Sequence, residues 1–318
     1  MTKLLNVEPW REIDRAPGET PVKIRLGDKL VIPSKPYQPV HLRSGDFVGR
    51  EREMTLIAAA WIGGPYSPPL SPLLVGDPGV GKNRIVYELS RRTGRALFMF
   101  QGHEDVTAED LACAVRFSDG PDAKMDYVAS PLVTAMARGG ICFIDEIGKI
   151  RPRALSLLVS VLDERRYIDS TLLGERVYAH PAFRFVAATN TGEVNALPEF
   201  IRSRMRPVIS VGYPPRREIE RVIARQFPDL RELDQLVGSF WCLWENKKEP
   251  RAPTPRDAIY LFTLAASLAE FERANQAGRF RSAGPGQPFP TERHEGPPAI
   301  EPRHLETAFE NLFSEADQ

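Results

Sequence analysis

A glycine-rich turn between a predicted strand and a predicted helix constrains this chain more than any other feature. Apolar residues at 73–75 precede the turn, an amphipathic helical pattern follows it, and the turn itself reads Gly76-Asp77-Pro78-Gly79-Val80-Gly81-Lys82. Glycine permits backbone angles and a close approach that a side chain would block. Backbone N–H groups at the helix N-terminus can then point at a polyphosphate, and Lys82 would reach its β- and γ-phosphates. We therefore expect residues 76–82 to bind the polyphosphate of a nucleotide.

The position after Lys82 departs from the usual pattern of such loops. Ser or Thr normally stands there and holds Mg²⁺ through its hydroxyl, whereas this chain has Asn83 followed by Arg84. Asn83 can still offer a carbonyl oxygen, so we expect it to be a Mg²⁺ ligand, and we include Arg84 in the nucleotide-binding segment. The substitution weakens the inference of hydrolysis more than the inference of nucleotide binding.

Composition narrows the class of protein. The 318 residues include 42 Lys and Arg against 42 Asp and Glu, a neutral balance that argues against a protein whose main role is to coat DNA or RNA. Cys113, Cys142 and Cys242 are far apart, imply no disulfide framework and fit a reducing compartment. Cys142 lies in an apolar run, so we expect it to be buried. Because we find no signal core and no apolar run of about 20 residues, we expect a cytoplasmic protein without a membrane partner.

Residues 46–212 alternate apolar strand candidates with amphipathic helices, which is the pattern of an α/β fold. The strand candidate that ends at Asp145 is apolar without alternation, which indicates a central strand of a parallel sheet. Strands are expected at 73–75, 96–100, 141–145, 184–189 and 207–211, and helices at about 51–61, 82–92, 107–116, 131–138, 152–164 and 196–203.

The two flanking regions differ from this core. Residues 1–45 are rich in proline, which prevents a long helix, and alternate well enough at 22–32 to predict a short hairpin. We expect this region to be an extended arm packed on the core or on a neighbour. Residues 213–318 show helical patterns only, with a capping box at Thr254. The polar insert at 278–298 is expected to be a mobile loop.

Two strand ends in the core supply candidate chemistry. Asp145 and Glu146 follow the apolar run at 141–144, and Asn190 follows the apolar strand at 184–189. Ligands of open parallel sheets bind beyond the carboxyl ends of the strands, where these side chains would lie. Asp145 can hold Mg²⁺, and Glu146 can polarise a water molecule for attack on the γ-phosphate. Asn190 would contact that water or the phosphate if its strand neighbours the Asp145 strand; otherwise it is a turn residue.

These motifs together resemble those of the AAA+ ATPases. The segments 76–82, 141–146 and 188–190 have the order and separations of the Walker A, Walker B and sensor-1 motifs. The segments 130–147 and 211–216 resemble the MoxR-like branch more narrowly. The resemblance implies an α/β fold in which an AAA+ core with a central parallel sheet flanked by helices precedes a small all-helical lid domain.

The resemblance also implies roles for residues outside these motifs. Arg204 matches the arginine finger that one subunit supplies to its neighbour's nucleotide, with Arg202 as the alternative and a solvated basic edge as the non-functional interpretation. Arg256 matches the sensor-2 arginine of the lid, although it could be an ordinary exposed residue at a helix start. The segments 117–127 and 166–178 resemble the helix-2 insert and the pre-sensor-1 hairpin of relatives, and three of their aromatic residues either grip a substrate or pack: Phe117, Tyr127 and Tyr167.

The function implied by the resemblance is ATP hydrolysis, with Mg²⁺, by a homo-oligomeric ring, expected to be a hexamer. Such a ring would remodel or assemble a protein partner, which in relatives often has a von Willebrand A domain. Two other functions stay open at this point. Asn83 favours a nucleotide-switched assembly scaffold with weak hydrolysis, and the neutral charge disfavours the third possibility, a motor stimulated by nucleic acid.

Overall fold

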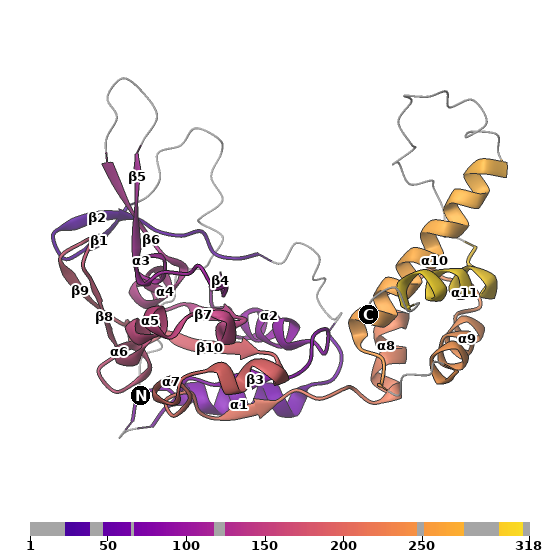
Figure 1. Cartoon of the computed structure of the whole chain (residues 1–318), viewed down its shortest axis with the longest axis horizontal. Helices are drawn as coiled ribbons and strands as arrows, with labels where there is room; N and C mark the ends of the chain where they lie inside the picture. Colours follow the sequence, from indigo (N-terminus) through magenta and orange to yellow (C-terminus); the bar gives the residue numbers. More distant parts are fainter. Residues whose placement is uncertain are drawn as a thin grey trace. The chain divides into compact units, whose positions relative to one another are not determined.

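The computed structural model describes residues 23–38, 47–64, 67–117, 125–246, 251–276 and 299–313 (Figure 1). The chain divides into two compact units. Unit 1 comprises Met1–Leu42 and Arg50–Gly212, and unit 2 comprises Arg43–Gly49 and Tyr213–Gln318. The division into arm, core and lid stays a prediction, and the insert expected at 278–298 lies outside the described residues.

Unit 1 is built on a five-stranded parallel sheet, ordered as β11 (Val208–Ser210), β3 (Leu73–Val75), β10 (Arg184–Thr189), β7 (Ile141–Asp145) and β4 (Leu97–Gln101). All residues of β7 are buried, including Cys142 as predicted. A strand that is apolar along its whole length fits a sheet covered on both faces. The five predicted strands are confirmed, and the carboxyl ends of β3, β7 and β10 meet at one edge.

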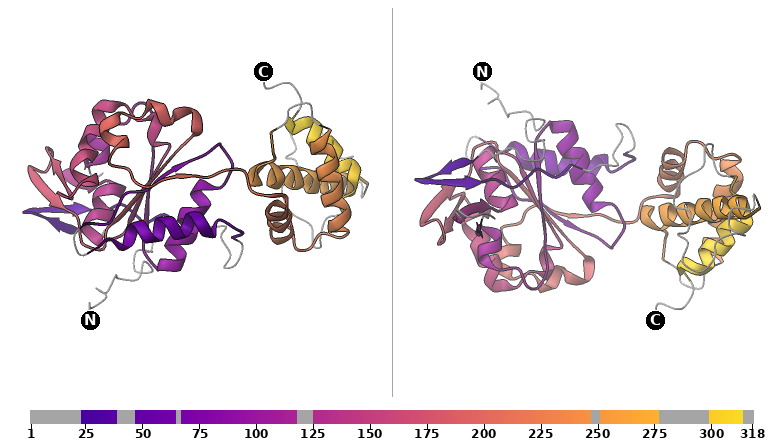
Figure 2. Two further views of the ribbon diagram at one scale, coloured as in Figure 1. Left: turned by 90° about the horizontal axis from the view of Figure 1, so that it is seen from below. Right: turned by 90° about the horizontal axis from the view of Figure 1, so that it is seen from above.

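Helices cover both faces of this sheet. The helices α1 (Glu51–Ile62) and α2 (Lys82–Thr93), in indigo and violet, lie on the face opposite to α7 (Glu199–Arg202), in salmon (Figure 2). Helix α4 (Pro131–Arg138) begins where the Ser130 hydroxyl accepts a hydrogen bond from the Val133 N–H at 3.0 Å. These helices leave the carboxyl edge of the sheet to the loops that follow the strands.

Two predicted helices are shorter than expected. The segment 152–164 contains α5 (Pro152–Leu155) and α6 (Val159–Leu162), separated by a 3₁₀ turn, instead of one continuous helix. The helix predicted at 196–203 starts only at Glu199, as α7. Proline disfavours the α conformation in the residue before it, and Pro198 stands immediately before α7.

A second sheet of unit 1 shows that the helix predicted at 107–116 was wrong. Helix α3 (Ala108–Leu111) has only four residues, and the strand β5 (Cys113–Phe117) follows it. The sheet also contains β6 (Met125–Ala129), β2 (Lys29–Ile32) and β1 (Ile24–Leu26), in the order β1-β2-β6-β5. Strand β5 pairs antiparallel with β6, and this pairing overrides the local helical pattern. The hairpin predicted at 22–32 is present as β1 and β2.

The segment 23–38 contacts two hairpins: a first hairpin formed by β5 and β6, at the place of the expected helix-2 insert, and a second hairpin at the predicted position 166–178. Strand β2 pairs parallel with β6 of the first hairpin, and its Val31 side chain is fully buried. The second hairpin consists of β8 (Tyr167–Ser170) and β9 (Glu175–Tyr178), as predicted. The Asp28 N–H donates to Glu175 Oε1 at 3.2 Å. One segment therefore touches both hairpins.

Unit 2 is helical, with α8 (Arg216–Gln226), α9 (Leu233–Glu245), α10 (Pro255–Gln276) and α11 (Pro302–Phe313). Its core is aromatic: Phe240 and Phe262 are fully buried, and their ring centroids lie 6.1 Å apart. The predicted capping box is present, since the Thr254 hydroxyl accepts from the Asp257 N–H at 3.2 Å. Among the described residues, no helix combines the length and apolar character needed to cross a bilayer.

Candidate nucleotide site

The glycine-rich loop lies between the end of β3 and the start of α2, as the sequence predicts. Gly79 and Gly81 have φ angles of 86° and 103°, which an L side chain rarely adopts. Gly76 cannot carry a side chain for another reason, because a Cβ there would lie 2.3 Å from the Val211 carbonyl oxygen. The loop thus has the backbone that a phosphate cradle requires.

Lys82 lies beneath this loop and connects it to β10. Only 8% of Lys82 is exposed. Its Nζ donates to the Gly76 carbonyl at 2.6 Å, to the Asp77 carbonyl at 3.2 Å and to Asn190 Oδ1 at 3.0 Å. Strand β10 neighbours β7 in the sheet, so the condition set for Asn190 in the sequence analysis is met.

Asn83 and Asp145 lie in direct contact. Asn83 Nδ2 donates to Asp145 Oδ2 at 2.6 Å, and the Glu146 N–H donates to Asp145 Oδ1 at 3.0 Å. Burial raises the pKa of Asp145 above its usual value of 3.8, while the hydrogen bond from Asn83 opposes that rise. Asn83 uses its amide nitrogen for this bond, which leaves its carbonyl oxygen as an acceptor. Carboxylate and carbonyl oxygens are the hard donors that suit Mg²⁺, so the two residues fit this ion.

Glu146 follows β7 with a positive φ of 53°, an uncommon conformation for a residue with a side chain. Its carboxylate is held by two donors, Gln101 Nε2 at 2.8 Å and Lys149 Nζ at 2.9 Å, both on Oε2. The sequence analysis missed these two residues. The i,i+3 spacing to Lys149 could have indicated that contact, whereas Gln101 is found only when β4 is placed beside β7 in register with Asp145.

The two candidate finger arginines differ in their partners. Arg202 forms an ion pair with Glu199, one turn away on α7. Arg204 Nε lies 3.7 Å from Asp163 Oδ2 and is buried without a hydrogen-bond partner. Arg165, and to a lesser extent Arg204, hold the pKa of Asp163 below its usual value. Arg204 is thus the less fully hydrogen-bonded of the two.

The structure brings five of the predicted site residues together: Lys82, Asn83, Asp145, Glu146 and Asn190. Arg84 lies half-buried in the first turn of α2. Arg256 is exposed in the first turn of α10, which belongs to unit 2, so its predicted contact with nucleotide stays a prediction.

Comparisons with known proteins identify the family of the chain. The family model described as AAA domain (dynein-related subfamily) matches residues 71–205. The protein NorQ of Paracoccus denitrificans (strain Pd 1222), a MoxR-family ATPase, is 32% identical over 215 residues, which cover 65% of this chain and 78% of NorQ. The chain belongs to the MoxR-like AAA+ ATPases. An uncharacterized protein of Staphylococcus saprophyticus is 33% identical over 145 residues, and the match spans 55% of that protein.

Solved structures support the same AAA+ fold. A mutant of the Thermotoga maritima RuvB protein matches with a TM-score of 0.53 at 19% identity, covering 84% of this chain and 70% of that one. This likeness concerns the fold alone. The central parallel sheet of this MoxR-like protein, its flanking helices and its C-terminal helical unit are those of an AAA+ core with a helical lid.

Proposed function

We propose that this AAA+ protein binds ATP with Mg²⁺ on the loop 76–82 and hydrolyses it at an interface between two copies of the chain. The observation that carries this proposal is the joining of four elements at one edge of the sheet. Lys82 bonds Asn190 at 3.0 Å, and Asn83 bonds Asp145 at 2.6 Å, so loop, helix α2, β7 and β10 converge where a γ-phosphate would lie.

Each of these residues has a role in the proposal. Lys82 would exchange its carbonyl partners for the β- and γ-phosphates, and Asn83 and Asp145 would hold Mg²⁺, which supplies positive charge to the phosphate oxygens. Glu146 would orient and deprotonate the attacking water once Gln101 and Lys149 release its carboxylate. Asn190 would keep the water or the γ-phosphate in place.

Arg204 completes the proposed site from a second copy. Its guanidinium is held by the Phe200 carbonyl at 2.7 Å and by Asp163 at 3.7 Å, contacts that a phosphate can replace. An arginine supplied in trans raises phosphoryl-transfer rates about 10³–10⁵-fold. A closed ring, in our proposal a hexamer, would give every copy both a nucleotide and an arginine.

A ring of this kind would act on a protein partner, in our proposal one with a von Willebrand A domain. The first hairpin offers the contact surface, because Phe117 is 71% exposed and pairs across the hairpin with Met125, which is 53% exposed. Tyr127 is half-buried against β2, and the Tyr167 ring lies 4.0 Å from the Arg176 guanidinium. These contacts favour packing for both tyrosines and gripping for Phe117.

A nucleotide-switched scaffold is the second candidate function. Asn83 supports it, because its amide group takes one carboxylate oxygen of Asp145 at 2.6 Å and no hydroxyl is present to bind Mg²⁺. Steady turnover that depends on Arg204 would exclude this alternative.

A mixing experiment tests the shared site. Lys82→Ala and Arg204→Ala should each lack ATPase activity, and their mixture should recover part of it, because some interfaces then combine an intact Lys82 with an intact Arg204. Arg202→Ala mixed with Lys82→Ala provides the matched control: Arg202→Ala alone should already be active. A mixture as inactive as its two components, with oligomers shown to exchange subunits, would disprove catalysis in trans.

A further inference from the structure

Three arginines gather at the amino edge of the central sheet, opposite the candidate nucleotide site. Arg95 precedes β4, Arg166 precedes β8, and Arg184 is the first residue of β10. All three side chains are half-buried. At about 3.3 Å per strand residue, the length of β10 separates Arg184 from Asn190 by roughly 20 Å. The cluster is therefore distinct from the nucleotide site.

Backbone carbonyls of the loop before β10 accept hydrogen bonds from all three guanidinium groups. Arg95 Nη1 donates to the Ala182 carbonyl at 2.6 Å. Arg166 Nη2 and Arg184 Nη1 donate to one and the same oxygen, the Phe183 carbonyl, at 3.0 Å and 2.8 Å. These two nitrogens thus lie within two hydrogen-bond lengths of each other, although both groups are positively charged.

No carboxylate among the described residues forms an ion pair with any of the three arginines, which donate to backbone carbonyls instead. Burial and, after it, the charges of Arg95 and Arg166 lower the pKa of Arg184 to about 10. Nε and Nη2 of Arg95 and of Arg184 have no hydrogen-bond partner among the described residues, and these atoms are not completely buried. They are therefore donors that remain available to a ligand.

We propose that Arg95, Arg166 and Arg184 form a second anion-binding site, which takes the phosphate groups of a small polyphosphate. The planar guanidinium fork matches phosphate oxygens with two parallel hydrogen bonds. Three positive charges without an acidic neighbour favour a multivalent anion over a single carboxylate. Its binding would neutralise the repulsion between the paired guanidinium groups. The site does not depend on the function proposed for the loop 76–82.

The rigidity of the cluster supports a preformed site. The Arg166 guanidinium lies 5.1 Å from the centroid of the Phe183 ring, which is fully buried. The backbone of Arg166 has a positive φ of 52°. In a residue with a side chain, the surrounding structure must maintain this conformation. A ligand would thus find the donors already oriented, which lowers the entropic cost of binding.

Calorimetric titration with inorganic pyrophosphate tests the proposal in full-length protein. The titration uses the Lys82→Ala background, so that the loop 76–82 does not compete for the probe. We expect saturable binding that weakens about tenfold or more when Arg184→Gln is added, since charge-assisted hydrogen bonds are lost. Arg153→Gln, an exposed arginine of the same unit, is the matched control and should leave the affinity unchanged.

The outcomes separate binding from a structural role. Arg95→Lys serves as a second variant, because it keeps the charge but loses the fork, and it should also weaken pyrophosphate binding. ADP titrated in parallel distinguishes a nucleotide source of the phosphates from a free polyphosphate. If folded Lys82→Ala protein binds no pyrophosphate, if it binds only an acidic peptide, or if Arg153→Gln and Arg184→Gln weaken binding equally, the proposal is wrong.

Discussion

The two edges of the central sheet differ in how their charged side chains are paired. At the carboxyl edge, Lys82 and the carboxylate of Asp145 are each engaged by neutral amide groups, from Asn190 and Asn83, and Glu146 has Lys149 as its counter-ion. At the amino edge, three arginines donate to a single loop, and the described part of the chain supplies no counter-ion for them. The charged groups of the carboxyl edge thus have partners before any ligand binds, whereas the positive charges of the amino edge are not neutralised. This difference is the reason why we propose an anion-binding site at the amino edge and not another cation site.

Lys82→Ala should have the largest effect and should separate the two edges. Loss of the ammonium group removes the charge that would face the β- and γ-phosphates, so ATP binding should weaken about 100-fold or more and hydrolysis should become undetectable. Fluorescent ATP titration and phosphate release measure both. Pyrophosphate binding at the amino edge should persist; its complete loss in folded protein would show that the two edges are one site.

Glu146→Gln should abolish chemistry while it spares binding. The amide cannot accept a proton from water, so turnover should fall about 10²–10⁴-fold. ATP affinity should change little, because the proposed role of Glu146 concerns the attacking water and not the binding of the phosphates. Single-turnover hydrolysis and ATP titration on the same preparation check this. Wild-type turnover would remove Glu146 from the mechanism.

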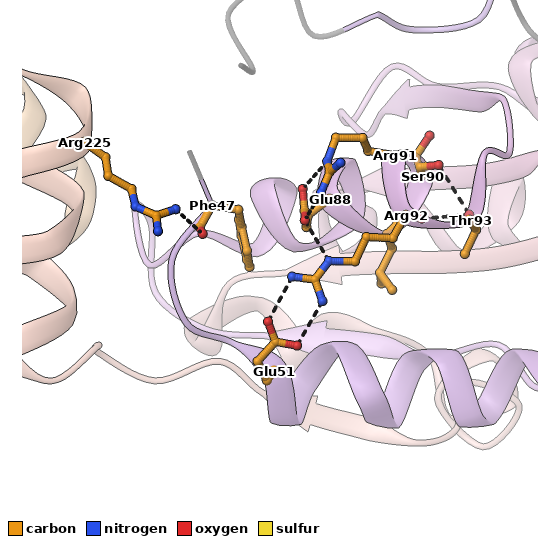
Figure 3. A network of polar contacts seen from close by, with 9 residues as sticks. Phe47, Glu51, Glu88, Ser90, Arg91, Arg92, Thr93 and Arg225 are labelled. Carbon is orange, nitrogen blue, oxygen red and sulfur yellow. Dashed lines mark hydrogen bonds and ion pairs between the residues drawn. The ribbon is translucent and has the colours of Figure 1, made fainter. Parts of the chain in front are cut away.

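Glu88→Gln should remove the carboxylate that two arginines of α2 share. On α2, Arg91 and Arg92 both donate to Glu88, and Arg92 also pairs with Glu51 at 2.9 Å (Figure 3). Removing this buried carboxylate should cost about 1–3 kcal/mol of unfolding free energy at neutral pH. Chemical denaturation of the variant and the wild type measures the difference.

The pH dependence of that loss has a definite sign. Hydrogen bonds from Arg91 and then Arg92 hold the pKa of Glu88 below 4.5 in the folded protein. Its contribution is therefore present in full above the unfolded value and is lost as the pH falls through the folded one. The gap between wild type and Glu88→Gln should narrow below about pH 4.5. A gap that stays constant down to pH 3 would contradict a role for this charge.

Asn83→Thr should have the smallest effect, and it tests the Mg²⁺ role proposed for position 83 at the carboxyl edge. A threonine hydroxyl can bind Mg²⁺ and can also donate to Asp145, as the Asn83 amide does. Steady-state ATPase activity should therefore stay unchanged or rise, by no more than about tenfold. Asn83→Leu, which has neither group, is the matched control and should be less active. Abolished turnover in correctly folded Asn83→Thr would refute the Mg²⁺ role of this position.

The sequence predicted those parts of the site that lie within short motifs. The loop 76–82 and the pair Asp145 and Glu146 are contiguous, and their strands are apolar enough to be recognised alone. Asn190 needed one assumption about neighbouring strands, which the pairing of β10 with β7 confirms. The roles assigned to these residues, and those of Arg204 and Arg256, stay predictions.

Contacts between distant segments account for what the sequence could not predict. The contact of Gln101 with Glu146 requires the register of β4 and β7. The strand β5 was interpreted as helix because its pairing with β6 does not show in its own local pattern. The three arginines of the amino edge share no motif, and only the folded loop before β10 brings them together.

The pairing of β2 with β6 has a practical consequence for shortened versions of this protein. In the intact chain, β2 covers the backbone N–H and C=O groups along one side of β6, with Val31 opposite Tyr127. A chain that starts after residue 32 would leave that side of β6 uncovered, and bare strand edges recruit strands from other molecules. Amino-terminal truncation would thus promote self-association at the first hairpin, and any assembly observed with such a protein would have to be distinguished from a nucleotide-dependent ring.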